Sequence, residues 1–205
     1  MKETKPGGTG TPAGAAQARV PVPPAGSSRM KKAKLATLWL DGCSGCHMSI
    51  LDVDEAIAAV GQKADLVYGP LVDAQEFPED VDVTIVEGAV SSQEDYEKIK
   101  HVREHTRLLV ALGDCAVTSN VPAMRNPIPV KKLLERIYIQ GVDAQPRIPT
   151  EGVPPLLKRA IPLQEVVKVD LFVPGCPPPA STIGFVLGEL LDGRMPDLST
   201  KVKFG

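Results

Sequence analysis

Five short apolar runs, each ending at or near a glycine, are separated along the chain by helical patterns. The runs cover residues 34–40, 64–69, 81–88, 107–113 and 169–175. The clearest helical patterns cover residues 47–61, 91–105 and 181–193, and the second opens with serines suited to capping. Because strands that alternate with helices form parallel sheets, the sequence predicts an α/β fold. We expect a flavodoxin-like domain: a five-stranded parallel sheet with helices on both faces, in the order 2-1-3-4-5 that is frequent among such folds.

The first 32 residues differ from the rest of the chain. They are rich in Gly, Pro and Ala and contain almost no large apolar side chains. Such a segment does not bury enough surface to offset the entropy of ordering it. We therefore expect a disordered tail at residues 1–32 and a single folded domain at residues 33–205. The tail has neither the apolar stretch of a secretory signal nor a twin arginine, so we expect a cytoplasmic protein.

Charge and hydropathy argue against two classes of partner. The formal net charge of -2 gives no reason to expect nucleic acid. No apolar run reaches the roughly 18–20 residues of a membrane-spanning helix, so no membrane association is expected. No Gly-x-Gly-x-x-Gly or Walker A motif follows a predicted strand, and nucleotide binding is therefore unsupported. A flavin mononucleotide site would rest on the fold class alone.

Residues 125–165 interrupt the alternation of strands and helices. A helical pattern at residues 130–139 is followed by a proline-rich excursion at about residues 140–165. A segment of this length with little regular structure is uncommon in a compact domain unless it is functional. Two interpretations stay open: a surface that contacts a partner, and a mobile surface excursion.

The four cysteines of the chain all follow predicted strands. Cys43 and Cys46 come after the first strand, Cys115 after the fourth and Cys176 after the fifth. In a parallel sheet these loops lie at one edge, the carboxyl end of the strands, where ligands of open α/β sheets bind. We therefore expect the fold to bring four thiols from three separate places in the sequence to one side of the domain.

Four thiolates fit either a tetrahedral zinc ion or an iron–sulfur cluster. Structural zinc sites usually use two short local pairs, whereas this chain has one Cys-x-x-Cys pair and two single cysteines far along the sequence. The spacing therefore favours a cluster over zinc. A thioredoxin-like dithiol at Cys43 and Cys46 stays open as a third interpretation, but it leaves Cys115 and Cys176 without a role.

Residues beside the cysteines are candidates for lining the site. Backbone N–H groups around the Cys-x-x-Cys pair and around Cys115 are expected to point at the sulfurs. His47 fits either a proton-handling group or a partly exposed residue of a first helical turn, and Glu87 fits either the site lining or the end of the third strand. The candidates are Gly42, Ser44, Gly45, His47, Glu87, Asp114 and Pro177. Elsewhere, Trp39 is expected in the core, and His101 and His105 on a solvated helix surface.

Taken together, the motifs "LDGCSGCHMS", "EGAV", "ALGDCA" and "VPGCPPP" resemble those of nickel–iron hydrogenase small subunits and of the related iron–sulfur subunit of respiratory complex I. The resemblance runs from about Lys34 to Gly193. It implies that Cys43, Cys46, Cys115 and Cys176 hold one proximal 4Fe-4S cluster. It also implies a partner, a large subunit that carries the nickel–iron site, so that no catalytic residue is expected in this chain.

Departures from the wider family narrow the resemblance. Complex I subunits place two cysteines next to each other at the first site, whereas here they are spaced as Cys-x-x-Cys. Membrane-bound and periplasmic hydrogenases add a twin-arginine signal and a second cysteine-rich domain, and here no cysteine follows Cys176. The chain is thus most similar to the small subunit of cytoplasmic NAD-reducing hydrogenases, in which the nickel–iron dimer docks on a diaphorase with flavin and iron–sulfur clusters. The alternatives are a quinone-linked complex I-type relay and a zinc-stabilised module without catalytic function.

Overall fold

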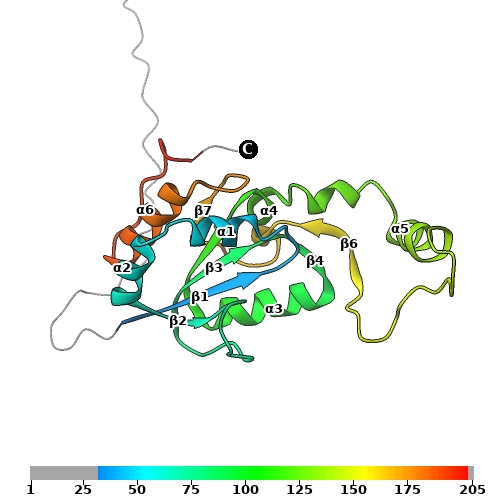
Figure 1. Cartoon of the computed structure of the whole chain (residues 1–205), viewed down its shortest axis with the longest axis horizontal. Helices are drawn as coiled ribbons and strands as arrows, with labels where there is room; N and C mark the ends of the chain where they lie inside the picture. The colour runs from blue at the N-terminus through cyan, green and yellow to red at the C-terminus, as the bar shows by residue number, and fades with distance from the viewer. Residues whose placement is uncertain (1–31, 203–205) are drawn as a thin grey trace, which may run out of the picture.

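The computed structural model of the chain describes residues 32–202 and places a five-stranded sheet at the centre of the domain (Figure 1). All neighbouring strands of this sheet are parallel, and their order is β2-β1-β3-β5-β7. The strands are β2 (Ala64–Tyr68), β1 (Ala33–Trp39), β3 (Val81–Glu87), β5 (Thr106–Leu112) and β7 (Leu171–Val173). Both the flavodoxin-like fold and its strand order are therefore confirmed. The predicted tail at residues 1–32 lies, except for Lys32, outside the described residues.

Helices cover both faces of the sheet, as the strand–helix alternation predicts. The alternation of side chains along β5 shows the two layers, because Val110 packs with Ile183 on one face while its neighbour Leu109 packs with Ile99 on the other. The helices of the first face are α1 (Gly45–Leu51), α2 (Ala56–Lys63) and α6 (Ala180–Leu191). Those of the second face are α3 (Gln93–Glu104) and α4 (Asp114–Thr118), with the short 3-10 turn η3 (Leu163–Glu165).

The single helix expected at residues 47–61 is two helices. α1 ends before Asp52, and four turn residues separate it from α2. Asp54 in this turn has a φ of 54°, the left-handed conformation that Asp adopts more readily than most residues. The apolar spacing continues through the turn, so hydrophobic periodicity alone did not reveal the break.

The proline-rich excursion contains a strand that the sequence did not reveal. β6 (Leu156–Ile161) pairs antiparallel with β4 (Val90–Ser92), forming a second, two-stranded sheet. Between these two strands the chain also forms the 3-10 turn η1 (Pro122–Arg125), the helix α5 (Val130–Glu135) and the π-helical turn η2 (Arg136–Gln140). The irregular part of the excursion is thus shorter than expected, because β6 begins at Leu156.

Two further expectations concern single side chains. Trp39 is 48% exposed, so its assignment to the core is wrong; it is the last residue of β1 and lies at the carboxyl edge of the sheet. His101 is exposed as expected, with its ring against that of His105, at 4.3 Å between centroids.

Among residues 32–202, no helix is both long and apolar enough to cross a membrane.

Candidate metal centre

The structure brings all four cysteines to the carboxyl edge of the sheet. Cys43 lies in the loop after β1, and Cys46 in the first turn of α1. Cys115 lies in α4, directly after β5, and Cys176 in the loop between β7 and α6. The strands that precede these loops lie close together in the sheet: β5 and β7 are neighbours, and only β3 separates β1 from β5. The predicted convergence is present, while the role of the cysteines as ligands stays a prediction.

Gly113 allows the loop that carries Cys43 and Cys46 to meet the loop that carries Cys115. Its φ of +83° is a conformation that residues with a side chain rarely adopt. A Cβ built on Gly113 would lie 2.2 Å from Sγ of Cys46, so the sulfur occupies the space that a side chain would fill. The Cys46 sulfur therefore sits directly on the backbone that precedes Cys115.

Asp114 joins the loop that carries Cys115 to the loop that carries Cys176. Its N–H donates to the carbonyl oxygen of Gly175 at 2.9 Å, and its Oδ1 accepts from the N–H of Gly175 at 2.6 Å. The N–H of Gly113 donates to the carbonyl oxygen of Val173 at 2.8 Å. These bonds fix the backbone before Cys115 against the backbone before Cys176. Asp114 thus acts on the site by holding two cysteine loops in register.

Polar N–H groups point at three of the sulfurs. The N–H of Gly45 lies 3.4 Å from Sγ of Cys43, and Nδ2 of Asn120 lies 3.5 Å from Sγ of Cys176. The backbone N–H of Val121 bonds to Cys115. Gly45 was expected among the donors, whereas Asn120 and Val121 were missed. Both lie in the turn after α4, where Asn120 has a φ of 20°, and the sequence carried no clear signal for this turn.

The thiols influence one another electrostatically. Burial raises the pKa of the Cys46 thiol far above its ordinary value, and the negative charges of Glu87 and of the other three cysteines raise it further. Burial also raises the pKa of Cys115, against the effect of the Val121 N–H. Four thiolates gathered at a partly buried edge therefore need a positively charged centre to hold them in that form.

Buried Glu87 and partly exposed His47 form a pair beside Cys46. Oε2 of Glu87 accepts from the backbone N–H of His47 at 2.8 Å and lies 2.5 Å from its ring Nδ1. Glu87 is 2% exposed, and within residues 32–202 the buried Nε2 of His47 has no hydrogen-bond partner. His47 lies in the first turn of α1 and its side chain is 12% exposed, so the interpretation as a partly exposed residue of a first helical turn is confirmed, while a proton-handling role stays a prediction. Glu87 connects the end of β3 to the helix that carries Cys46.

The remaining candidates shape the loops. Ser44 precedes α1 in a left-handed conformation with a φ of 66°. Gly42 lies against Gly88, whose Cα would be 3.3 Å from a Cβ at Gly42. Pro177 follows Cys176 through a cis peptide bond. All three lie next to a cysteine or between the two cysteines of the pair, and they set the path of the backbone without contributing a polar side-chain contact of their own.

The four thiols are the groups at this edge that could hold a metal centre. Within residues 32–202, no three His, Cys, Asp or Glu side chains are gathered closely enough to hold one metal ion. Yet the charges of all four cysteines act on one another, which places the sulfurs in one neighbourhood. A cluster that binds each cysteine to a different iron spans such a spread, whereas zinc requires every sulfur at about 2.3 Å from one atom.

Comparison with known proteins places the chain among redox subunits. The family described as "NADH ubiquinone oxidoreductase, 20 Kd subunit" matches residues 43–190. The "NAD-reducing hydrogenase HoxS subunit delta" of Cupriavidus necator is 39% identical over 89% of this chain and 90% of its own length. A component of the F420-non-reducing hydrogenase of Methanocaldococcus jannaschii is 35% identical over 82% of this chain, which spans only 59% of that relative.

A solved structure agrees with the sequence relatives. A chain in the crystal structure of an NAD+-reducing [NiFe]-hydrogenase in the H2-reduced state superposes with a TM-score of 0.82 and 35% sequence identity. The match covers 85% of this chain and 100% of the other. The fold described above, including the parallel sheet that carries the cysteine loops, is therefore shared over nearly the whole described domain.

Proposed function

Since the chain belongs to the family of nickel–iron hydrogenase small subunits, we propose that it is the electron-relay subunit of an NAD-reducing nickel–iron hydrogenase. The observation that carries this proposal is the meeting of Cys43, Cys46, Cys115 and Cys176, from three loops, at one edge of a parallel sheet. The lengths support it as well, because the chain covers 90% of the C. necator subunit and the whole of the solved hydrogenase chain.

The four cysteines would hold one 4Fe-4S cluster. The donor set fits such a cluster, because it consists of thiols alone and because Gly113 leaves room for the Cys46 sulfur. When bound, the cluster would supply one-electron transfer between centres on neighbouring subunits. The residues of this chain hold, orient and partly bury the sulfurs.

The surroundings of the sulfurs would set the reduction potential of the site. Hydrogen bonds to cysteine sulfurs and burial are the protein's means of tuning an iron–sulfur centre. Here the N–H groups of Gly45, Val121 and Asn120 point at three of the four sulfurs, and Cys46 is 8% exposed. Asp114 keeps the two later loops together, so that these donors and the sulfurs keep their relative positions.

The proposed partners follow from the function. Hydrogen would be split at a nickel–iron site on a large subunit, and electrons would pass through this chain to a diaphorase with flavin and iron–sulfur clusters, where NAD+ is reduced. We place the complex in the cytoplasm. No second cofactor in this chain, such as flavin mononucleotide, is part of the proposal.

A second candidate function is a quinone-linked relay of the complex I type, which the match to the ubiquinone oxidoreductase family favours. The two candidates differ in whether the co-purified complex contains nickel. A complex I-type relay would co-purify with a dehydrogenase activity and without nickel, whereas a hydrogenase subunit would co-purify with a nickel-containing partner. Zinc in place of iron would instead identify a structural module.

The deciding experiment is anaerobic purification of the complex, with metal analysis and activity measured on the same sample. We expect about four iron atoms bound to this subunit, as a Cys-ligated 4Fe-4S cluster requires. Cys115→Ser removes one ligand and should abolish this iron, its visible absorption and hydrogen-dependent NAD+ reduction. Thr118→Ser, an exposed position in the same helix, is the matched control and should leave all three unchanged. Normal iron content and turnover in Cys115→Ser would refute the proposal.

A further inference from the structure

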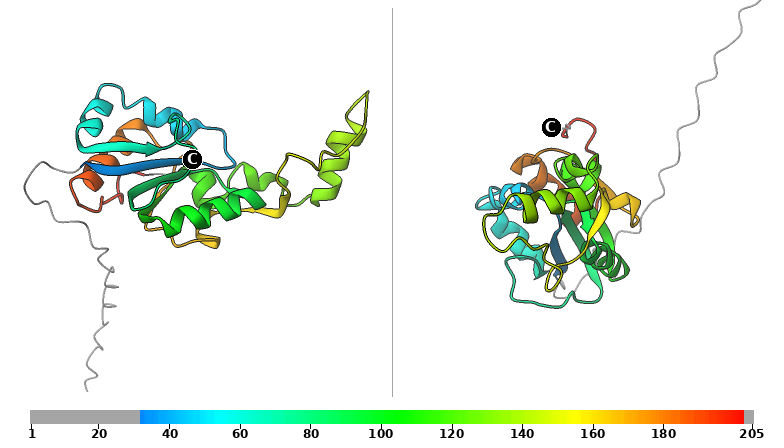
Figure 2. Two further views of the ribbon diagram at one scale, coloured as in Figure 1. Left: turned by 90° about the horizontal axis from the view of Figure 1, so that it is seen from below. Right: turned by 90° about the vertical axis from the view of Figure 1, so that its right-hand side faces the viewer.

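Residues 126–155, which we call the projecting arm, stand out from the domain (Figure 2). The arm contains α5 and η2, and its base is firmly attached. Asn126 donates to the carbonyl oxygen of Ala160 and accepts from its N–H, both at 2.8 Å. Next to it, Arg125 donates to the carbonyl oxygen of Leu157 at 3.1 Å. The arm is therefore held in a fixed place relative to β4 and β6 at its base.

Beyond its base, the arm has an apolar surface that the domain does not cover. Neither α5 nor η2 has a buried residue. In the described part of the chain, no side-chain hydrogen bond or ion pair joins residues 127–154 to the rest of the domain. An exposed apolar surface of this kind marks a site that contacts another protein. The exposed apolar residues of the arm are Ile128, Ile137, Tyr138, Ile139, Val142 and Val153.

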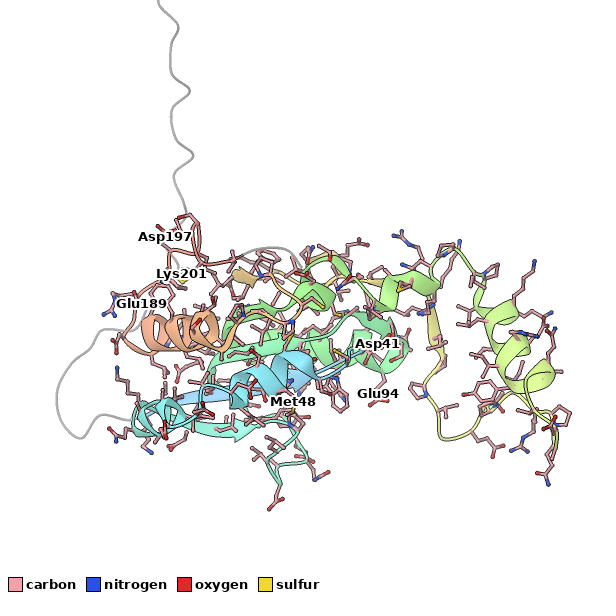
Figure 3. The ribbon with its side chains drawn as sticks, turned by 45° about the horizontal axis from the view of Figure 1, so that its top comes forward. Asp41, Met48, Glu94, Glu189, Asp197 and Lys201 are labelled. Carbon is pink, nitrogen blue, oxygen red and sulfur yellow. The ribbon has the colours of Figure 1, made fainter. Side chains whose placement is uncertain are left out.

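The arm projects on the same side as the cysteine loops. The strands of the parallel sheet run toward it, so it extends beyond their carboxyl edge (Figure 1). Asp41, which follows β1 on the way to Cys43, lies on the side of the domain that faces the arm (Figure 3). Between Cys115 and the arm, Val121 and Met124 are also exposed, the latter by 75%. Exposed apolar side chains thus occur along the chain from the cysteine edge to the arm.

From this placement we infer that the projecting arm is a docking element for the nickel–iron subunit, an inference that rests on the proposed function. Electrons from a nickel–iron site enter through the cysteine edge, so the subunit that carries this site must cover that edge. A subunit seated there meets the arm beside it. The exposed apolar residues of the arm are interspersed with Lys131, Lys132 and Arg136, of which Lys131 forms an ion pair with Glu135 at 3.9 Å. The remaining positive charge favours a partner surface that is apolar with acidic groups around it.

Photo-cross-linking in the complete complex identifies what covers the arm. Tyr138→p-benzoylphenylalanine places the reactive group on the apolar surface of the arm, and the same replacement at Met195 is the control. Met195 is 39% exposed and follows α6 at the end of the domain opposite to the arm, where Glu189 and Asp197 also lie (Figure 3). We expect a covalent product between this chain and the nickel–iron subunit from position 138 and none from position 195. No product, or a product with the diaphorase or with a second copy of this chain, would overturn the inference.

Affinity provides a second readout that separates the inference from the proposed function. Ile137→Asp with Ile139→Asp places two charges on the exposed apolar surface of η2, and Met195→Asp is the control. We expect the Kd between this chain and the nickel–iron subunit to rise at least tenfold in the arm variant and to stay unchanged in the control. The iron content of the arm variant should stay at that of the unsubstituted chain, because its cysteines are untouched. An unchanged Kd with full iron content refutes the role of the arm, whereas an unsubstituted chain without iron refutes the proposed function.

Discussion

Gly113→Ala should destabilise the domain and displace a sulfur of the proposed cluster site. The added Cβ would lie 2.2 Å from Sγ of Cys46. Carbon and sulfur atoms in contact normally stand well over 3 Å apart, so the sulfur has to retreat by roughly 1 Å or more. Protein–metal distances in working sites vary by only about 0.2 Å. Either the Cys46 side chain rotates away or the loop moves, and in both cases the sulfur leaves its place.

The backbone conformation sets the size of the effect on stability. A residue with a side chain at a φ of +83° costs about 1–3 kcal/mol. For a domain of this size, each kcal/mol lowers the midpoint of thermal unfolding by about 2–4 °C. We therefore expect a midpoint about 2–12 °C lower, before any contribution from the contact with Cys46 is added.

Thermal unfolding and iron analysis on the same preparations test this reasoning. Gly188→Ala is the matched control, because a Cβ there meets nothing within 4 Å and the residue lies inside α6. Alanine in a helix interior is favoured over glycine by about 1 kcal/mol, so the control should be as stable as the unsubstituted chain or slightly more stable. If Gly113→Ala keeps both its iron and its unfolding midpoint, the close contact between the two cysteine loops is not what shapes the site.

Three further predictions concern the surroundings of the site. Ser92→Ala removes the side-chain cap of α3 and should lower the free energy of unfolding by about 1 kcal/mol. Urea denaturation measures this change, and an unchanged midpoint would contradict the capping box. Glu87→Ala removes the acceptor of the part-buried N–H of His47 and should cost about 1–3 kcal/mol in the same assay, whereas a neutral effect would show that this contact does not support the loop. In the metal-free chain, brief iodoacetamide treatment should alkylate the exposed Cys43 early and Cys46 last, because burial raises the pKa of the Cys46 thiol. Mass spectrometry measures the order, and the reverse order would contradict the burial of Cys46.

The strands and the place of the cysteines were predictable because their signals are local. An apolar run such as residues 81–87 shows its burial in the run itself, and glycines mark its end. Since all strands of a parallel sheet end at one edge, the loops after them must lie together. That argument brought Cys43, Cys115 and Cys176 together from sequence alone.

The elements that were missed depend on contacts between distant residues. β6 is flanked by prolines and carries polar residues, so its sequence alone does not indicate a strand. It becomes a strand by pairing with β4. The break between α1 and α2 depends on a turn conformation at Asp54 that apolar spacing does not record. Trp39 was assigned to the core by its residue type, yet the end of β1 places it at an uncovered edge.

The sequence by itself determined the parallel sheet, the edge at which its four cysteines gather and the thiol chemistry available there, because residue type and period carry that information. Tertiary structure decided how the loops fit together. It seated the Cys46 sulfur on the backbone of Gly113, tied Asp114 to Gly175, and buried Glu87 against His47. It also left the apolar face of the projecting arm uncovered. These features follow from backbone geometry and packing between segments far apart in the chain, which no single stretch of sequence specifies.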